Sequence, residues 1–340
     1  MIGRRWGGRT VLVALFASAL AFGAAGRAAG QERYALLVEG ASGEPQYATL
    51  HRGWLDALHG LLVDRFKMNA ANIVVLADKP VEGESRATAD NLRAEVAKLV
   101  PRVKADDQLF VFLIGHGTAS AGEAKFNLIG PDLSAAEWKD LLAPVTGTLV
   151  FVNTTSASFP YLAGLSGPKH VVITATRTAA EKFHTQFADA FIKALAAPEA
   201  DADKNARISM LEAFTYASQL VAQGYEREDA MATEHAVLDD NGDGQGRVAA
   251  DAGDDGAIAG MTYLDAEVLP TSSDPEVQAL IKRQADLTRQ IDDLRRRRAS
   301  MPPIAFDQQF EPLIIELATV SREVRRRTGG QVLDRSLDPR

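Results

Sequence analysis

The chain has 340 residues, of which 46% are hydrophobic, a formal net charge of -8 at pH 7 and no cysteine. This length is enough for one large domain with an appendage, or for two domains, each with a hydrophobic core. The excess of acidic residues argues against nucleic acid as a partner. The absence of cysteine excludes disulfide bonds, lipoprotein acylation and a cysteine nucleophile.

Residues 1–30 have the features of an export signal peptide. Basic residues at 4, 5 and 9 precede an apolar segment at 11–23, and Ala28-Ala29-Gly30 offers a cleavage site before Gln31. The apolar segment is rich in Ala and Gly and shorter than the roughly 20 residues that a membrane span needs. We therefore expect a cleaved signal, a periplasmic or secreted mature chain and no membrane span after cleavage. Whether export uses the general or the twin-arginine route stays open.

From residue 34 to about residue 195, short apolar segments alternate with segments of helical spacing. The predicted strands lie at 34–38, 73–76, 108–114, 148–152 and 170–174, and the predicted helices at 47–66, 92–100, 134–142 and 185–195. A Ser134-x-x-Glu137 capping box is typical of a helix start. Unbroken apolar strands between amphipathic helices predict an α/β fold, in which a mostly parallel sheet is covered on both faces as a three-layer sandwich.

In such a sheet, functional sites form beyond the carboxyl ends of the strands. His116 follows the strand at 108–114 within Gly115-His116-Gly117, and Asn153-Thr-Thr-Ser156 follows the strand at 148–152. Together with Leu37-Val-Glu-Gly-Ala-Ser-Gly43 and Val171-Val-Ile-Thr-Ala-Thr176, these segments resemble the legumain branch of the caspase-like peptidases. The resemblance covers about residues 34–195 and implies a caspase-like sandwich fold.

The resemblance also implies roles for individual residues. It places His116 at the catalytic histidine and Thr155 at the position of the family's cysteine, with Thr154 or Ser156 there if the register shifts by one. It places Thr176 beside the substrate, which in this family is an Asn- or Asp-containing peptide. Arg177 follows the same strand end. It can receive a carboxylate of the substrate, or pair with Glu181 one helical turn later, and both interpretations stay open.

The chain departs from the family at the nucleophile. A threonine hydroxyl ionises far less readily than a thiol, and β-branching restricts its rotamers. We therefore expect a catalytically degenerate peptidase homologue that binds a peptide or protein ligand. One alternative is an active hydrolase with His116 as base, Thr155 or Ser156 as nucleophile and the Gly117 amide in an oxyanion hole. The other is a coiled-coil interaction protein with the α/β domain as a platform.

Two Asp-rich loops resemble calcium sites. The first has EF-hand spacing, with Ala206 in place of the usual glycine at a strain of about 1–2 kcal/mol. Its candidate ligands are Asp201, Asp203, Asn205, Arg207 (through its backbone), Ser209 and Glu212. The second has Asp239, Asn241 and Asp243, but an alanine at position 12. We expect Ca²⁺ in the first loop. The alternatives are a helix-capping loop for the first and a flexible Asp-Gly turn for the second.

The C-terminal region differs in kind from the rest. Apolar residues with heptad spacing at 277–294 and 310–324 flank the breaker Ser300-Met-Pro-Pro303, which predicts a helical hairpin or short coiled coil capable of self-association. Arginine runs end both helices and either favour the helix dipole or form a docking site. The expected organisation is therefore a signal peptide at 1–30, a caspase/legumain-like α/β domain with Asp-rich loops at 31–272, and the hairpin and tail at 273–340. His51, His59 and His184 lack metal-ligand spacing and are interpreted as packing or surface residues.

Overall fold

The computed structural model describes residues 31–328 except 121–122, 179, 252, 267–271, 297 and 299–300. The predicted signal peptide at 1–30 and the tail at 329–340 lie outside these residues. Among the helices that are described, none has both the length and the apolar character needed to cross a membrane.

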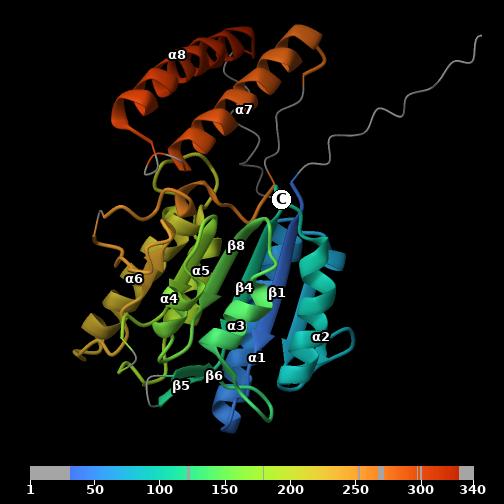
Figure 1. The fold of residues 1–340 in the computed structure, drawn as a ribbon, viewed down its shortest axis with the longest axis vertical. Helices are drawn as coiled ribbons and strands as arrows, with labels where there is room; N and C mark the ends of the chain where they lie inside the picture. Colours follow the sequence, from blue (N-terminus) through green and yellow to red (C-terminus); the bar gives the residue numbers. More distant parts are fainter. Residues whose placement is uncertain are drawn as a thin grey trace, which may run out of the picture. The chain divides into compact units, whose positions relative to one another are not determined.

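A mostly parallel sheet forms the centre of the α/β domain (Figure 1). In the described residues it has seven strands in the order β10-β9-β8-β4-β1-β2-β3, of which β10 alone runs antiparallel to its neighbour. Their bounds are β1 Arg33–Glu39, β2 Ile73–Ala77, β3 Ser85–Arg86, β4 Gln108–Ile114, β8 Thr148–Asn153, β9 His170–Thr174 and β10 Val237–Asp239. The five strands predicted from the sequence are thus present, and β3 and β10 extend the sheet at its two edges.

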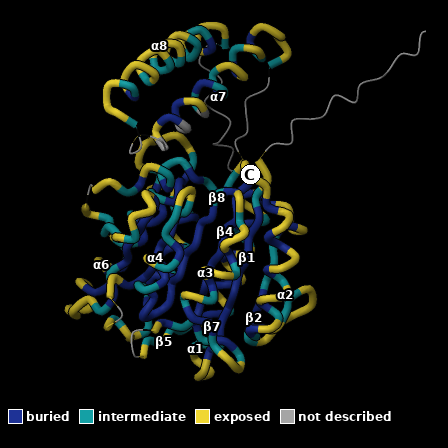
Figure 2. Tube along the Cα trace, in the orientation of Figure 1, coloured by how far each residue is buried: buried dark blue, intermediate teal, exposed yellow. Residues whose placement is uncertain are grey.

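Strand periodicity divides the core into two layers, one on each face of the sheet. In β1, Ala35 and Leu37 pack into one layer, whereas Leu36 and Val38 pack into the other, because successive side chains point to opposite faces. The first layer is covered by α1 Pro45–Gly60, α5 Phe187–Ala196 and α6 Met210–Arg227, and the second by α2 Ala89–Leu99, α3 Ala135–Leu142 and α4 Pro160–Leu165. Figure 2 shows the strands buried between these helices. The predicted three-layer α/β sandwich is confirmed.

Local sequence signals set several helix ends. Ser134 and Glu137 form the predicted capping box at the start of α3, and Ser209 and Glu212 form a second one at the start of α6. The predicted helix at 47–66 begins earlier, with Pro45 at its first position, and passes into a π-helical turn at Leu61–Arg65. A small antiparallel sheet of β5 Gly117–Ser120, β6 Glu123–Phe126 and β7 Leu133–Ser134 was not predicted.

The C-terminal segment forms the predicted hairpin from α7 Pro275–Arg296 and α8 Pro303–Thr328. Val277 and Ile281 of α7 form a small apolar cluster with Val324 of α8. The two helices run antiparallel, as an ion pair between Arg327, near the end of α8, and Glu276, near the start of α7, shows (2.6 Å). One arginine of the basic runs contacts the other helix of the hairpin, because the Arg295 guanidinium of α7 lies 5.6 Å from the centre of the Phe310 ring of α8.

Candidate functional site

The carboxyl ends of β4 and β8 bring the sequence-predicted histidine and hydroxyl residues to the same edge of the sheet. The two strands are parallel neighbours, in which Leu113 pairs with Asn153. The segments that follow are in direct contact, because the Ser156 hydroxyl donates to the Gly117 carbonyl oxygen (2.9 Å). A Cβ atom on Gly117 would lie only 2.2 Å from the Ser156 carbonyl oxygen. The glycine after His116 is therefore required for this close approach.

The hydroxyl groups at the predicted nucleophile positions are buried and form local hydrogen bonds. Thr155 and Ser156 are 1% and 4% exposed. The Thr155 hydroxyl donates to Oδ1 of Asn153 (2.7 Å), and the Thr154 hydroxyl donates to the Leu113 carbonyl oxygen (2.7 Å). Each hydroxyl proton is thus directed at an oxygen within the fold rather than at an imidazole nitrogen. This arrangement supports a structural role for the hydroxyls, because a nucleophile has to present its oxygen to a substrate and its proton to a base.

The connection from β9 to α5 covers the segment that contains these hydroxyls. The Ala157 amide donates to the Glu181 carbonyl oxygen (2.8 Å), and the Thr185 hydroxyl donates to the Thr154 carbonyl oxygen (2.5 Å). Ala157 also has a positive φ of 53°, which is unfavourable for a residue with a Cβ atom. The two segments therefore fix each other in an irregular but hydrogen-bonded conformation.

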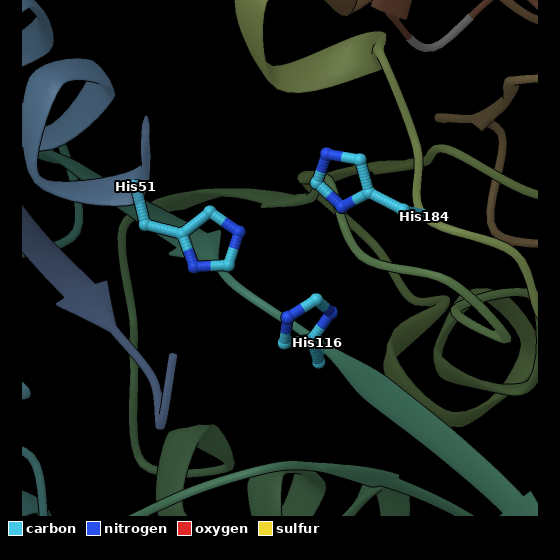
Figure 3. Close-up of side chains that lie close together, drawn as sticks. All are labelled: His51, His116 and His184. Carbon is cyan, nitrogen blue, oxygen red and sulfur yellow. The ribbon is translucent and has the colours of Figure 1, made fainter. Parts of the chain in front are cut away.

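Three histidines from separate parts of the chain meet beside this edge (Figure 3). His51 lies in α1, His116 follows β4, and His184 lies in the connection from β9 to α5. The ring centres of His51 and His116 are 4.9 Å apart, those of His116 and His184 5.8 Å, and those of His51 and His184 5.9 Å. Tyr47 and Trp54, also in α1, complete the cluster through ring contacts with the histidines.

Burial favours the neutral form of all three imidazoles. Burial, together with the neighbouring His116 and His184, lowers the pKa of His51 to about 4, and the Asp78 carboxylate opposes this shift. Burial also lowers the pKa of His116, although a hydrogen bond to the backbone of Ser42 opposes this shift. The pKa of His184 is lowered by burial and by His116. At neutral pH the cluster is therefore a set of uncharged rings with lone pairs available to a ligand.

The residues assigned to substrate binding have different environments. Thr176 is buried, and its hydroxyl is within hydrogen-bond distance of the Ser158 hydroxyl (3.1 Å). Arg177 is exposed and pairs with Glu181, whose Oε2 accepts from the Arg177 amide (2.9 Å) and whose Oε1 lies 3.7 Å from Nε. Glu181 also contacts Nδ1 of His235 (2.7 Å). The Glu181 alternative for Arg177 is thus present in the structure, and it leaves part of the guanidinium in solvent.

The first Asp-rich loop gathers its acidic side chains at one place. Carboxylate oxygens of Asp201, Asp203 and Glu212 all lie within 4.8 Å of one another. Asp201 accepts from the backbone amides of Asn205 and Ala206, and Glu212 accepts from those of Ala202 and Asp203. Ala206 has a φ of 65°, the left-handed turn expected at this position.

The remaining assigned residues of the first loop are held by other contacts. Asn205 accepts from the Arg207 amide through Oδ1 (2.8 Å). The Arg207 guanidinium pairs with Asp265 (2.8 Å) and stacks over Tyr263. Ser209 caps α6 together with Glu212, so the helix-capping alternative is realised in the same loop that gathers the carboxylates.

The second Asp-rich loop is a tight turn around one carboxylate. Asp239 accepts from the amides of Gly242 (3.0 Å) and Gly244 (2.8 Å), and Asp243 accepts from the Gln245 amide (2.7 Å). Asn241 accepts from the Asp243 amide (2.8 Å). These bonds match the Asp-Gly turn alternative, because each of the three side chains accepts from a backbone amide within the loop.

Sequence reasoning found His116 but not its two histidine partners. His51 lies on the buried face of α1 with Trp54, Leu55 and Leu58, a placement that its spacing of three, four and seven residues indicates. No comparable pattern marks His184, which lies in an irregular segment. The grouping of the three rings depends on how α1, β4 and the β9–α5 connection pack together, and local spacing does not contain that information.

Comparisons with known proteins do not assign the chain to a family. No protein-family model and no curated protein matches it. Similar solved structures include a protein of Geobacter sulfurreducens (12% identity, 61% of this chain and 92% of that one, TM-score 0.42) and caspase-1 of Spodoptera frugiperda (11%, 62% and 86%, 0.39). The Drosophila initiator caspase Dronc is a third (12%, 61% and 79%, 0.37). Structural neighbours thus include caspases, but at these identities and TM-scores they identify neither a family nor an activity.

Proposed function

We propose that the chain is an exported protein with a caspase-like, legumain-related α/β domain that does not hydrolyse peptide bonds and acts by binding a peptide or protein ligand. The observation that carries this proposal is the state of the hydroxyls after β8. Thr155 and Ser156 are buried, and their hydroxyl protons bond to Asn153 and Gly117. A threonine or serine nucleophile needs a base within hydrogen-bond reach and access to the substrate.

The environment of His116 supports the same proposal. Its ring contacts Tyr47, His51 and His184, which are aromatic rings rather than an aligned carboxylate. In a serine-type triad, a third group fixes the tautomer and orientation of the base. The active-hydrolase alternative has no comparable support from the contacts described here.

The exposed Arg177 favours ligands with a carboxylate. It lies just beyond the end of β9, and its partner Glu181 leaves about half of its side chain in solvent (51% exposed). Glu181 itself is largely buried (13% exposed), but its contact with the guanidinium is long, at 3.7 Å between Oε1 and Nε. The exposed part of the guanidinium can therefore receive an incoming carboxylate while Glu181 stays in place. This supports peptides containing Asp, or ending in a carboxylate, as the ligand class.

Two measurements on one set of peptides test the proposal. Fluorescently labelled Asp- and Asn-containing peptides are incubated with the purified chain, cleavage is followed by mass spectrometry, and binding is followed by fluorescence anisotropy. We expect binding without cleavage. Arg177→Ala should weaken the binding of Asp-containing peptides, whereas Arg86→Ala, an exposed arginine on the opposite edge strand β3, should leave it unchanged. Turnover by the unmodified chain that His116→Ala abolishes would contradict the proposal.

The first Asp-rich loop supports Ca²⁺ as a bound ion in this function. Three carboxylates held within 4.8 Å repel one another unless a cation neutralises them, and oxygen ligands at this spacing suit Ca²⁺. We retain Asp201, Asp203, Asn205, Ser209, Glu212 and the backbone of Arg207 as the proposed ligands. Asp239 and Asp243 belong to no comparable cluster of three carboxylates among the described residues, and the bonds of Asp239, Asn241 and Asp243 to backbone amides match the turn interpretation.

The hairpin supports a second candidate function, in which α7 and α8 mediate self-association or partner binding. Ile304 and Ile315 of α8 are 72% and 59% exposed, although the seam of the hairpin is apolar. Residues eleven positions apart lie on the same face of a helix, and an exposed apolar face can bind another helix. Analytical ultracentrifugation of the chain and of Ile304→Lys/Ile315→Lys tests this function, and a monomer in both cases would contradict self-association.

A further inference from the structure

The histidine cluster contains imidazole nitrogens without a partner at the place where three chain segments meet. Neither ring nitrogen of His51 has a hydrogen-bond partner among the described residues, although the residue is 0% exposed. Nδ1 of His184 is likewise buried and unpartnered within that part of the chain. Buried polar atoms are normally hydrogen-bonded, because an unsatisfied one costs about 1–3 kcal/mol. Unpartnered nitrogens on rings that face one another therefore point to a missing ligand.

The spacing of the rings fits a single metal ion. One nitrogen from each of the three residues lies within 4.8 Å of the other two. A tetrahedral ion with metal–nitrogen bonds of about 2.0–2.1 Å places its nitrogens about 3.4 Å apart and its imidazole ring centres about 5.2 Å apart. The observed ring centres are 4.9, 5.8 and 5.9 Å apart. Two of the three separations exceed the ideal value by up to about 0.7 Å, so ion binding would draw these rings closer together.

The surroundings fit the same ion. Figure 3 shows the three rings projecting from different segments towards a common space. The hydrogen bond between His116 and the backbone of Ser42 leaves the other ring nitrogen for a metal, which is the usual arrangement of a ligating histidine. His51 is buried and His116 and His184 are half-buried, so the site is largely shielded from solvent.

We propose that His51, His116 and His184 bind one divalent transition-metal ion, with Zn²⁺ as the first choice, and leave its fourth coordination position to water or to a ligand. Three imidazoles suit Zn²⁺, Cu²⁺ or Ni²⁺, whereas Ca²⁺ and Mg²⁺ require oxygen ligands. The site is thus chemically distinct from the Asp-rich loop. It goes beyond the proposed peptide-binding function and does not depend on it.

The competing explanation is that the histidines serve only as aromatic packing. Trp54 stacks on His184 with an interplanar angle of 4°, and it also stacks on His51. Histidine-to-phenylalanine substitutions separate the two explanations, because phenylalanine keeps a planar ring in the cluster and removes both nitrogens. Under the packing explanation, the variants and the unmodified chain respond to Zn²⁺ in the same way. Under the metal explanation, the unmodified chain binds Zn²⁺ and the variants lose this binding.

The experiment uses the full chain without an affinity tag, stripped with chelator and kept in Ca²⁺ so that the Asp-rich loop is saturated. Isothermal titration with Zn²⁺ is expected to give one ion per chain. His51→Phe and His184→Phe should each weaken binding by more than the roughly 10- to 100-fold that loss of an outer-shell partner costs. His59→Asn, an exposed histidine of the same helix, should bind as the unmodified chain does. Circular dichroism verifies that each variant is folded.

Loading with Co²⁺ provides a second measurement on the unmodified chain, for the case in which a variant does not fold. Intense visible absorption bands indicate four-coordinate Co²⁺, and Zn²⁺ should remove them in a one-to-one competition. Absence of stoichiometric Zn²⁺ binding would overturn the proposal. So would binding that survives in His184→Phe but is lost in Glu212→Gln, because the ion would then belong to the Asp-rich loop.

Discussion

Replacing Glu39 by glutamine tests whether a buried carboxyl group beside the candidate site lowers stability at neutral pH. Glu39 is the last residue of β1, pairs with Ile114 of β4 and is only 2% exposed. Its Oε2 has no hydrogen-bond partner within the described part of the chain. Burial raises its pKa to about 7. The charge of Arg52 and a hydrogen bond from the backbone of Asp78 oppose this shift, whereas the carboxylates of Asp78 and Glu84 add to it.

The sign and size of the effect follow from proton linkage. The folded state holds the Glu39 proton up to about pH 7, whereas the unfolded chain releases it near the usual pKa of 4.5. The free energy of unfolding therefore falls as pH rises between these two values. At about 1.4 kcal/mol per pKa unit, the loss reaches about 3 kcal/mol by pH 8. Below pH 4 the group contributes no pH dependence, since it is protonated in both states.

Urea unfolding of the unmodified chain and of Glu39→Gln between pH 4 and pH 9 measures this effect. Subtracting one profile from the other cancels the other titrating groups. We expect the variant to gain up to about 3 kcal/mol relative to the unmodified chain between pH 4 and pH 8. Glu82→Gln, at an exposed carboxyl group in the loop between β2 and β3, is the matched control substitution. A flat difference for Glu39→Gln would refute the reasoning.

Three further predictions follow from local geometry. Ca²⁺ at 100 times its dissociation constant should stabilise the chain by about 2.7 kcal/mol in thermal or urea unfolding. Glu212→Gln should abolish this stabilisation, whereas Asp243→Asn should not. Equal unfolding midpoints in calcium and in chelator would reject the metal assignment. Gly117→Ala should cost about 1–3 kcal/mol in urea unfolding, because its Cβ would lie 2.2 Å from the Ser156 carbonyl oxygen. In contrast, the Cβ atom added by Gly53→Ala in α1 meets no atom within 4 Å, and this substitution should stabilise the chain by about 0.5–1 kcal/mol. A loss of stability in Gly53→Ala, or no loss in Gly117→Ala, would contradict this reasoning. Ser134→Ala should cost about 1 kcal/mol by removing the cap of α3, and an unchanged midpoint would show that the cap is not needed.

The sheet could be predicted because its strands depend on short-range sequence features. Residues 108–114 and 170–174 were predicted with the bounds that the structure has, since unbroken apolar runs of this length are stable only when both faces are covered. The capping box at Ser134 marked the start of α3 for an equally local reason. In contrast, β3 and β10 have two and three residues, too few for periodicity to identify them.

The candidate site could be predicted only in part. The rule that sites form beyond the carboxyl ends of parallel strands located His116, Thr155 and Arg177 at one edge of the sheet. It did not indicate that the β9–α5 connection covers Thr155, because that depends on hydrogen bonds such as the one from Ala157 to Glu181. Irregular segments have no periodicity from which such contacts can be inferred.

The sequence by itself determined the α/β class, the positions of the five main strands along the chain, the hairpin at the C-terminus and the absence of a thiol nucleophile. Each of these depends on residue type or on spacing within a few positions. Only the tertiary structure decided that His51 and His184 join His116, and that the hydroxyls after β8 bond inward. Those outcomes depend on the packing of α1 and of the β9–α5 connection against the sheet. Such packing is settled by the burial of whole helix faces, and no short segment of the sequence records which side chains it brings together.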